Sequence, residues 1–208
     1  MIEVIEILRL LGKKRPVFHS EADFQHSLAW EIHKELPNAD VRLEMPVQID
    51  NHYIHIDIYI VNRDKILALE LKYKTCRFAT EVNGERYRLK DHSAQDIARY
   101  DLIKDIHRLE HLCSRQGKIT GYAIFLTNDR TYWTNPLNKS TVDANFRIND
   151  GRLLNGILRW GMNASIGTTK DREKPLELNN QYSVHWRDYS LLNQGKNEAF
   201  RYLMIKVL

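Results

Sequence analysis

Two neighbouring stretches of the chain carry acidic and basic residues in a pattern that suits metal-dependent chemistry. Residues 54–60 and 66–73 both alternate apolar and polar residues, which is typical of β-strands with two different faces. Asp57 lies in the first stretch, and Glu70 and Lys72 lie in the second. Two carboxylates beside a lysine can hold a divalent cation and polarise a water molecule, so we expect these three side chains to meet on one side of a sheet.

The apolar residues of the same stretches predict how the strands face. Because side chains alternate across a strand, the isoleucines of the first should share one face, as should the leucines and the tyrosine of the second. These residues are Ile54, Ile56, Ile58 and Ile60, and Leu67, Leu69, Leu71 and Tyr73. The polar break at 61–65 favours a hairpin between the two strands.

The flanking segments predict an α/β domain with a mixed sheet. An N-terminal helix should end at Gly12, and a second helix should run from an N-cap at Ser20 to about Leu36. We further expect strands at 41–47, 121–127, 182–187 and 200–207, helices at about 93–114 and 152–160, and turns at Asp50-Asn51 and Asn83-Gly84. Helices that alternate with strands in this way are typical of α/β folds.

Polar side chains interrupt the apolar faces of two predicted helices. Glu21 and Gln25 fall within the apolar arc of the second helix, and Gln95 falls in line with that of the long helix. A carboxylate on such a face is costly unless it is paired, protonated or bound to metal. Glu21 is therefore a candidate ligand, and the alternative is a first-turn glutamate favoured by the helix dipole.

The order Ile56-Asp57, twelve intervening residues and Glu70-Leu71-Lys72 resembles the PD-(D/E)XK nuclease superfamily, which has the restriction-endonuclease-like fold. The resemblance covers residues 18–127, within a single domain of residues 1–208. It leaves 128–208 as a C-terminal elaboration. Ile56 stands where that family has a proline before the first acid.

This resemblance implies a metal-dependent nuclease that hydrolyses phosphodiester bonds, with DNA as the expected substrate and Mg²⁺ or Mn²⁺ as the cofactor. Asp57, Glu70 and the backbone carbonyl of Leu71 would bind the cation, and Glu21 would complete its ligands. Lys72 would position the attacking water, help to deprotonate it, or stabilise the charge that develops on the phosphate.

The resemblance also implies roles on the long helix. Gln95 matches a glutamine that some family members carry near the metal, although Tyr100 follows it after five residues rather than four. A capping or core-edge amide is the alternative for Gln95. Arg99 is a candidate phosphate contact, and an exposed arginine without such a role is its alternative.

A basic segment at 77–92 is a candidate nucleic-acid surface. Its cations are interleaved with Phe78 and Tyr87, so phosphates could meet the cations while bases stack on the rings. The cations are Arg77, Arg86, Arg88 and Lys90. A charged hairpin with no nucleic-acid role remains the alternative.

Composition bounds the class of protein. The 208 residues are 43% hydrophobic and 28% charged, which is ordinary for a soluble globular domain. The chain has no apolar run long enough to span a membrane, and its N-terminus does not resemble a signal peptide. Its two cysteines lack metal-like spacing, which favours a cytoplasmic protein. The net charge of +4 permits a polyanionic partner without requiring one.

Two other functions remain open on these observations. The chain could be a nucleic-acid-binding module that lacks catalysis, or an accessory subunit whose acidic residues are structural. The C-terminal third carries Trp160, Trp186 and Tyr189, which could supply specificity, a homodimer contact or core packing.

Overall fold

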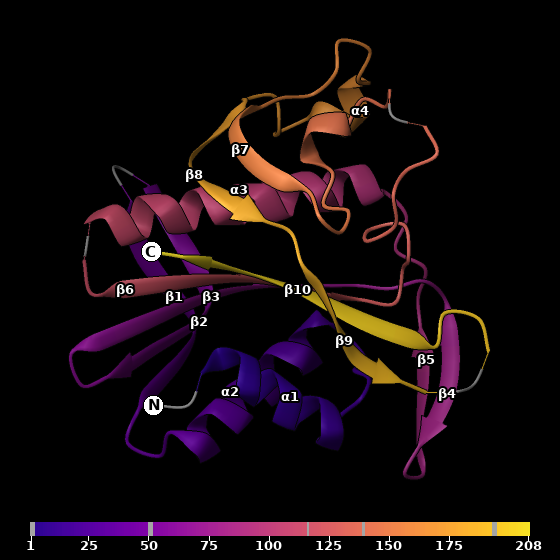
Figure 1. The fold of residues 1–208 in the computed structure, drawn as a ribbon. Helices are drawn as coiled ribbons and strands as arrows, with labels where there is room; N and C mark the ends of the chain where they lie inside the picture. Colours follow the sequence, from indigo (N-terminus) through magenta and orange to yellow (C-terminus); the bar gives the residue numbers. More distant parts are fainter. Residues whose placement is uncertain (1–2, 50–51, 116, 139, 193–194) are drawn as a thin grey trace.

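A six-stranded mixed sheet runs through the molecule, as Figure 1 shows. The computed structural model describes residues 3–49, 52–115, 117–138, 140–192 and 195–208. In sheet order, the strands are β1 (Asp40–Ile49), β2 (His52–Asn62), β3 (Lys65–Lys74), β6 (Ile119–Thr127), β10 (Ala199–Val207) and β9 (Trp186–Leu191). Among the strands that the structure describes, only β3 and β6 pair in parallel. The predicted mixed α/β architecture is confirmed, and the predicted turn at Asp50-Asn51 lies outside the described residues.

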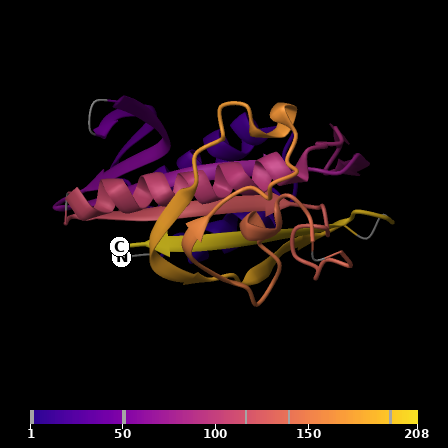
Figure 2. The same cartoon turned by 90° about the horizontal axis from the view of Figure 1, so that it is seen from above.

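Helices cover both faces of the sheet. The helices α1 (Val4–Lys14) and α2 (Glu21–Glu35) lie against one face, and α3 (Gln95–Arg115) crosses the other (Figures 1 and 2). Each face has its own core, because β-strand side chains alternate between them. Phe24 and Leu28 belong to the α1–α2 core, whereas Leu102 and Ile106 belong to the α3 core. No helix within the described ranges is long and apolar enough to cross a membrane.

Two hairpins lie outside the main sheet. The first pairs β4 (Phe78–Val82) with β5 (Glu85–Leu89) through the predicted Asn83-Gly84 turn, where both residues have positive φ. The second pairs β7 (Leu153–Leu158) with β8 (Leu176–Ser183). The second hairpin lies over α3, together with the short helices η1 (Ala144–Phe146) and α4 (Ile166–Thr169) (Figure 1).

The C-terminal third departs from the predicted elements. Residues 152–160 were expected to be helical, but they contain the strand β7, whose Leu154 and Leu158 are buried against the α3 core. The single strand expected at 182–187 is also wrong, since β8 ends and β9 begins within it. Pairing with partners far along the chain decides these segments, and local patterns do not contain that information. This third supplies β9 and β10 to the main sheet.

The start of α2 follows its predicted local signal, whereas the end of α1 does not. The predicted N-cap is confirmed, because the Asp23 backbone N–H donates to Ser20 Oγ at 3.1 Å. Gly12 does not end α1, which continues to Lys14. A side chain at Gly12 would come within 3.1 Å of the backbone oxygen of Tyr189 on β9. The glycine therefore permits close packing rather than a helix stop.

The faces of β2 differ from the predicted alternation, whereas those of β3 follow it. Ile54 and Ile56 pack with the α3 core, but Ile58 and Ile60 pack with the α1–α2 core. The change falls at Asp57, opposite Glu44, where the register of β1 and β2 skips one pair. Glu44 has a φ of 50°, which is uncommon for a residue other than glycine. A local twist of the β1–β2 hairpin thus coincides with the first predicted catalytic residue.

Candidate functional site

Asp57 and Glu21 lie where β2 and β3 stop pairing. The ladder between these strands ends at Leu69, although β3 continues for another five residues. Beyond that point the Leu71 N–H donates to Asp57 Oδ2 at 2.6 Å, and the Tyr73 N–H donates to Glu21 Oε2 at 2.7 Å. Two carboxylates therefore accept the hydrogen bonds that a neighbouring strand would otherwise satisfy.

Glu70 and Lys72 project from β3 toward α3, on the face of the sheet opposite to that of Leu69 and Leu71. Lys72 Nζ lies 2.6 Å from Asp105 Oδ2 and donates to the carbonyl oxygen of Leu71 at 3.1 Å. Arg108 Nη1 donates to Asp105 Oδ1 at 3.2 Å, and Arg108 Nη2 lies 3.4 Å from Glu70 Oε1. The predicted lysine is thus held by a buried carboxylate of α3.

Gln25 joins α2 to the twisted part of the β1–β2 hairpin. Its Nε2 atom donates to the carbonyl oxygen of Asp57 at 2.8 Å and to Glu44 Oε1 at 2.6 Å. The polar residue on the apolar arc of α2 therefore binds the backbone beside Asp57. Glu44 is consequently held near Asp57 by a side-chain contact as well as by its strained backbone.

Carboxylates outnumber cations around β3, in what we call the acidic cluster. It consists of the carboxylates Glu21, Glu44, Asp57, Glu70 and Asp105 and the cations Lys72, Lys74 and Arg108. Burial outweighs the hydrogen bond from Leu71 and the charge of Lys72, and it raises the pKa of Asp57 to about 6. Burial and the nearby Asp105 raise the pKa of Glu70 well above its usual range. Burial therefore disfavours the charged form of both acids.

Lys72 is charged in this environment. Burial alone would lower its pKa, but the carboxylate of Asp105, with further contributions from Glu21 and Asp57, raises it above the ordinary lysine value. Lys72 can therefore donate hydrogen bonds and stabilise negative charge, and it is poorly suited to accept a proton.

Glu70 is the least compensated member of the acidic cluster. The residue is only 3% exposed, and its Oε1 atom has no hydrogen-bond partner in the described part of the chain. Its ion pair with Arg108 is long, at 3.4 Å. A buried carboxylate oxygen without a hydrogen bond is costly, and a bound cation would remove that cost.

The donor atoms of the acidic cluster fit a hard dication. Carboxylate oxygens of Asp57 and Glu70 and the carbonyl oxygen of Leu71 are the type of ligand that Mg²⁺ and Mn²⁺ prefer. In the described ranges, no three His, Cys, Asp or Glu side chains are already arranged around one metal position. The carbonyl of Leu71 accepts a hydrogen bond from Lys72, so a cation there would compete with that contact.

Gln95 has its described contact outside the acidic cluster. Its Nε2 atom donates to Asp129 Oδ2 at 3.1 Å, just after the end of β6. Ten residues of helix separate Gln95 from Asp105, which corresponds to about 15 Å along the axis. The amide therefore joins the start of α3 to the residues that follow β6.

The expectations for Arg99 are wrong. The residue is only 7% exposed, so it is neither a surface arginine nor a free phosphate contact. Its Nη1 atom donates to Asp143 Oδ2 at 2.5 Å, and its Nη2 atom donates to the carbonyl oxygen of Thr131. The guanidinium is committed to an interior ion pair beneath the C-terminal layer.

The four other predicted nucleic-acid contacts are exposed, but the expected stacking rings are not. The exposed cations are Arg77, Arg86, Arg88 and Lys90. Phe78 and Tyr87 are buried, with Phe78 packed on Phe200 and Tyr87 stacked on His19 at a centroid distance of 4.3 Å. Base stacking on these two rings is therefore excluded in this arrangement, and the cations alone remain as candidate contacts.

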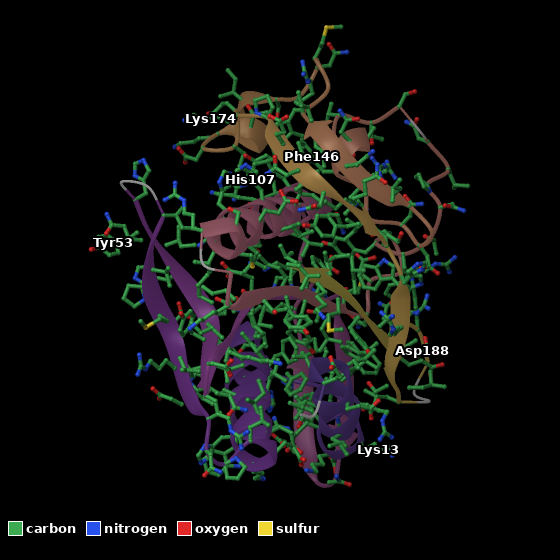
Figure 3. All side chains as sticks on the ribbon, turned by 60° about the vertical axis from the view of Figure 1, so that its left-hand side comes forward. Lys13, Tyr53, His107, Phe146, Lys174 and Asp188 are labelled. Atoms are coloured by element: carbon green, nitrogen blue, oxygen red, sulfur yellow. The ribbon has the colours of Figure 1, made fainter. Side chains whose placement is uncertain are left out.

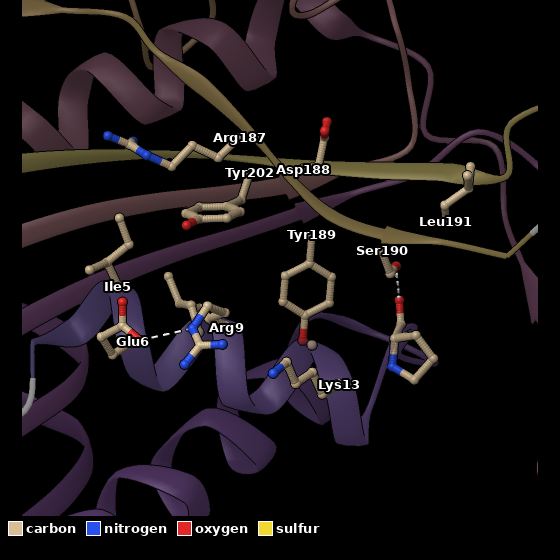
Figure 4. A pocket seen from close by; sticks show the side chains of 13 residues that line it. Ile5, Glu6, Arg9, Lys13, Arg187, Asp188, Tyr189, Ser190, Leu191 and Tyr202 are labelled. Atoms are coloured by element: carbon tan, nitrogen blue, oxygen red, sulfur yellow. Dashed lines mark hydrogen bonds and ion pairs between the residues drawn. The ribbon is translucent and has the colours of Figure 1, made fainter.

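Aromatic residues of the C-terminal third mainly pack within the protein. Trp160 stacks on Tyr100, and Trp186 lies in the α3 core. Tyr189 lines a hollow of about 510 Å³ between α1 and β9, and its hydroxyl donates to the carbonyl oxygen of Arg15 (Figure 4). The residues that line this hollow include no member of the acidic cluster.

Sequence reasoning missed four members of the acidic cluster: Glu44, Lys74, Asp105 and Arg108. Asp105 falls beside Ala98 and Leu102 on the helical wheel, so the argument applied to Glu21 could have identified it. Arg108 follows one turn later and pairs with it. Glu44 carries no comparable signal, because its place depends on a local break in strand pairing.

Comparisons with known proteins add no relative: no protein-family model, curated protein or solved structure matches the chain. The contacts, burial and charges of the acidic cluster are therefore the basis for its proposed role.

Proposed function

We propose that the chain is a metal-dependent nuclease that hydrolyses phosphodiester bonds in DNA and has the restriction-endonuclease-like fold of the PD-(D/E)XK superfamily. The observation that carries the proposal is the convergence of carboxylates around β3, above all the buried Glu70 Oε1 atom that has no hydrogen bond. A mixed sheet between two helical layers is compatible with that fold.

Each residue of the cluster has a role that follows from its contacts. Asp57, Glu70 and the carbonyl of Leu71 would hold Mg²⁺ or Mn²⁺, and Glu21 would contribute directly or through water. The bound cation would supply an activated water and neutralise phosphate charge. Lys72, which is protonated, would donate to the attacking water or to a phosphate oxygen.

The substrate class rests on charge. The exposed cations of the β4–β5 hairpin and its flanks, together with a net charge of +4, favour a polyanion. Phosphate contacts of this kind position a nucleic acid without reading its bases. We therefore propose duplex DNA as the first substrate to test, and RNA of the same sequence as its comparison.

Cleavage assays with matched variants test the proposal. The wild type should cleave DNA with Mg²⁺ or Mn²⁺ and not with excess chelator, whereas Asp57→Ala and Lys72→Ala should each lose about 100-fold or more. Asp64→Ala and Lys65→Ala remove the same side-chain types from the exposed turn between β2 and β3, and they should retain activity. Equal activity in all five preparations would reveal a contaminant and reject the assignment.

One observation favours a second function, a nucleic-acid-binding module without catalysis. Lys72 is paired with Asp105, and the described carboxylates do not yet surround a metal position. This function predicts DNA binding that is unchanged by Mg²⁺ and by Glu70→Ala, with no cleavage. Binding assays on the same preparations therefore separate the two functions.

A further inference from the structure

Two histidines lie one turn apart on α3, outside the acidic cluster. The Nε2 atoms of His107 and His111 are 3.2 Å apart, and their ring centroids are 4.5 Å apart at an interplanar angle of 68°. Both residues are half-buried. His107 projects from the side of α3 on which β7 and β8 lie (Figure 3).

The separation of the two nitrogen atoms matches that of two ligands on one metal ion. Zinc–imidazole bonds are about 2.0–2.1 Å, so two nitrogens at tetrahedral or right angles around a common ion lie about 2.9–3.4 Å apart. The pair in this protein falls inside that range without any change of rotamer. An alternative without metal is a hydrogen bond between two neutral rings, which the same distance permits.

The surroundings of the pair keep His107 neutral and place two carboxylates near it. Burial, followed by the proximity of His111, lowers the pKa of His107, which keeps the ring in the neutral form that a metal ligand requires. The carboxylates of Glu110 and Glu177 both face His107 closely enough to oppose that shift. Both oxygens of Glu110 already accept hydrogen bonds from β8, through residues that include Asn179 and Asn180.

We propose that His107 and His111 form a binding site for a borderline transition-metal dication of the Zn²⁺ and Ni²⁺ class. Imidazole suits these metals, whereas Mg²⁺ prefers oxygen ligands, so the site is distinct in chemistry from the acidic cluster. No third His, Cys, Asp or Glu completes a metal position in the described residues, so water would fill the remaining coordination positions of the ion. The bound ion clamps one turn of α3.

Calorimetric titration of untagged protein with ZnCl₂ tests the site. We expect one zinc to bind the wild type and MgCl₂ not to compete. His107→Ala and His111→Ala should each weaken zinc binding at least about tenfold. Alanine favours the helix, so both variants should fold. The matched control is the double variant His26→Ala/His33→Ala, which lacks two histidines of α2. This variant should bind zinc as tightly as the wild type does.

A second measurement needs no variant. Diethyl pyrocarbonate modifies neutral histidine rings, and mass spectrometry of peptides locates the modified residues. Zinc should protect His107 and His111 in the wild type and leave His26 and His33 reactive. Equal zinc affinity in wild type and in the His107→Ala/His111→Ala double variant, or no selective protection, would overturn the proposal.

Discussion

Two groups of charged residues contact α3, and they are built in opposite ways. The acidic cluster has more carboxylates than cations, and its acids have raised pKa values. The second group, which we call the Arg99–Asp143 group, places one carboxylate beside Arg99 and Arg147. Burial alone would raise the pKa of Asp143, but a hydrogen bond from Thr141 and the charge of Arg99 together hold it below its usual range.

The difference fits a structural role for the Arg99–Asp143 group and the proposed cation-binding role for the acidic cluster. In the Arg99–Asp143 group the buried carboxylate is paired with two guanidinium groups, so the group can fasten the C-terminal layer to α3 with no external ion. In the acidic cluster, the Oε1 atom of Glu70 has no hydrogen-bond partner in the described part of the chain, and burial raises the pKa of Asp57 to about 6. Such an arrangement costs stability and is retained most readily where a ligand supplies the missing charge.

The largest effect should come from breaking the compensated group. Arg99→Ala leaves Asp143 buried beside a single, more distant guanidinium, since Arg147 lies 3.8 Å away. Loss of one partner from a buried ion pair costs about 3–5 kcal/mol of unfolding free energy. Urea denaturation measures this loss. A cost below about 1 kcal/mol would mean that the pair does not hold the layer in place.

Neutralising one acid in each group should change stability in opposite directions. Asp57→Asn keeps an oxygen for the Leu71 N–H and removes an uncompensated charge, so it should stabilise the metal-free protein by about 1 kcal/mol at pH 7.5. Asp143→Asn removes a compensated charge and should destabilise it by about 2 kcal/mol. Thermal unfolding in chelator compares the two variants. Destabilisation by both would remove the distinction between the groups.

The pH dependence of stability should show the raised pKa of Asp57. In the folded protein this acid titrates at about 6, against an ordinary value of 3.8, so between these values the folded state holds the extra proton. Its contribution to stability is present below about pH 4 and is lost as the pH rises through about 6. Unfolding free energies of wild type and Asp57→Asn should therefore diverge across this window, in favour of the variant at higher pH. Parallel curves would contradict the raised pKa.

Divalent cations should offset the free energy of unfolding that the buried carboxylates of the acidic cluster cost, and they should leave the Arg99–Asp143 group unaffected. Saturating Mg²⁺ or Mn²⁺ at pH 7.5 should raise the unfolding midpoint of the wild type by an amount equivalent to about 1–3 kcal/mol. Glu70→Gln should abolish that shift, whereas Asp143→Asn should retain it. An undiminished shift in Glu70→Gln would place the cation elsewhere.

The smallest effect concerns the β4–β5 hairpin. Arg88→Ala removes one exposed cation, and if it contacts phosphate the salt dependence of DNA binding should weaken by about one unit of slope. Arg9→Ala on α1 also removes one exposed arginine and is the matched control. Fluorescence anisotropy over a range of NaCl concentrations measures both slopes. Identical slopes for these variants would exclude Arg88 from the contact.

The sequence by itself determined the elements whose signals are local. The alternation of β3 placed Glu70 and Lys72 together on one face, and Ser20 began α2 where its side chain could cap a free N–H. The Asn83-Gly84 turn formed because both residues tolerate positive φ. The mixed α/β class followed from the order of these elements.

Only the tertiary structure decided which charges are compensated. Asp105 reaches Lys72, and Asp143 reaches Arg99, from residues 33 and 44 positions away along the chain. The twist at Glu44 and the strand β7 depend in the same way on pairing between segments. Ion pairs and strand pairs join residues that are far apart in the sequence, so a local sequence pattern does not identify the partner residue. Local patterns in the sequence therefore identified the acids Asp57, Glu70 and Glu21, whereas the fold determined which basic side chains lie beside each buried carboxylate.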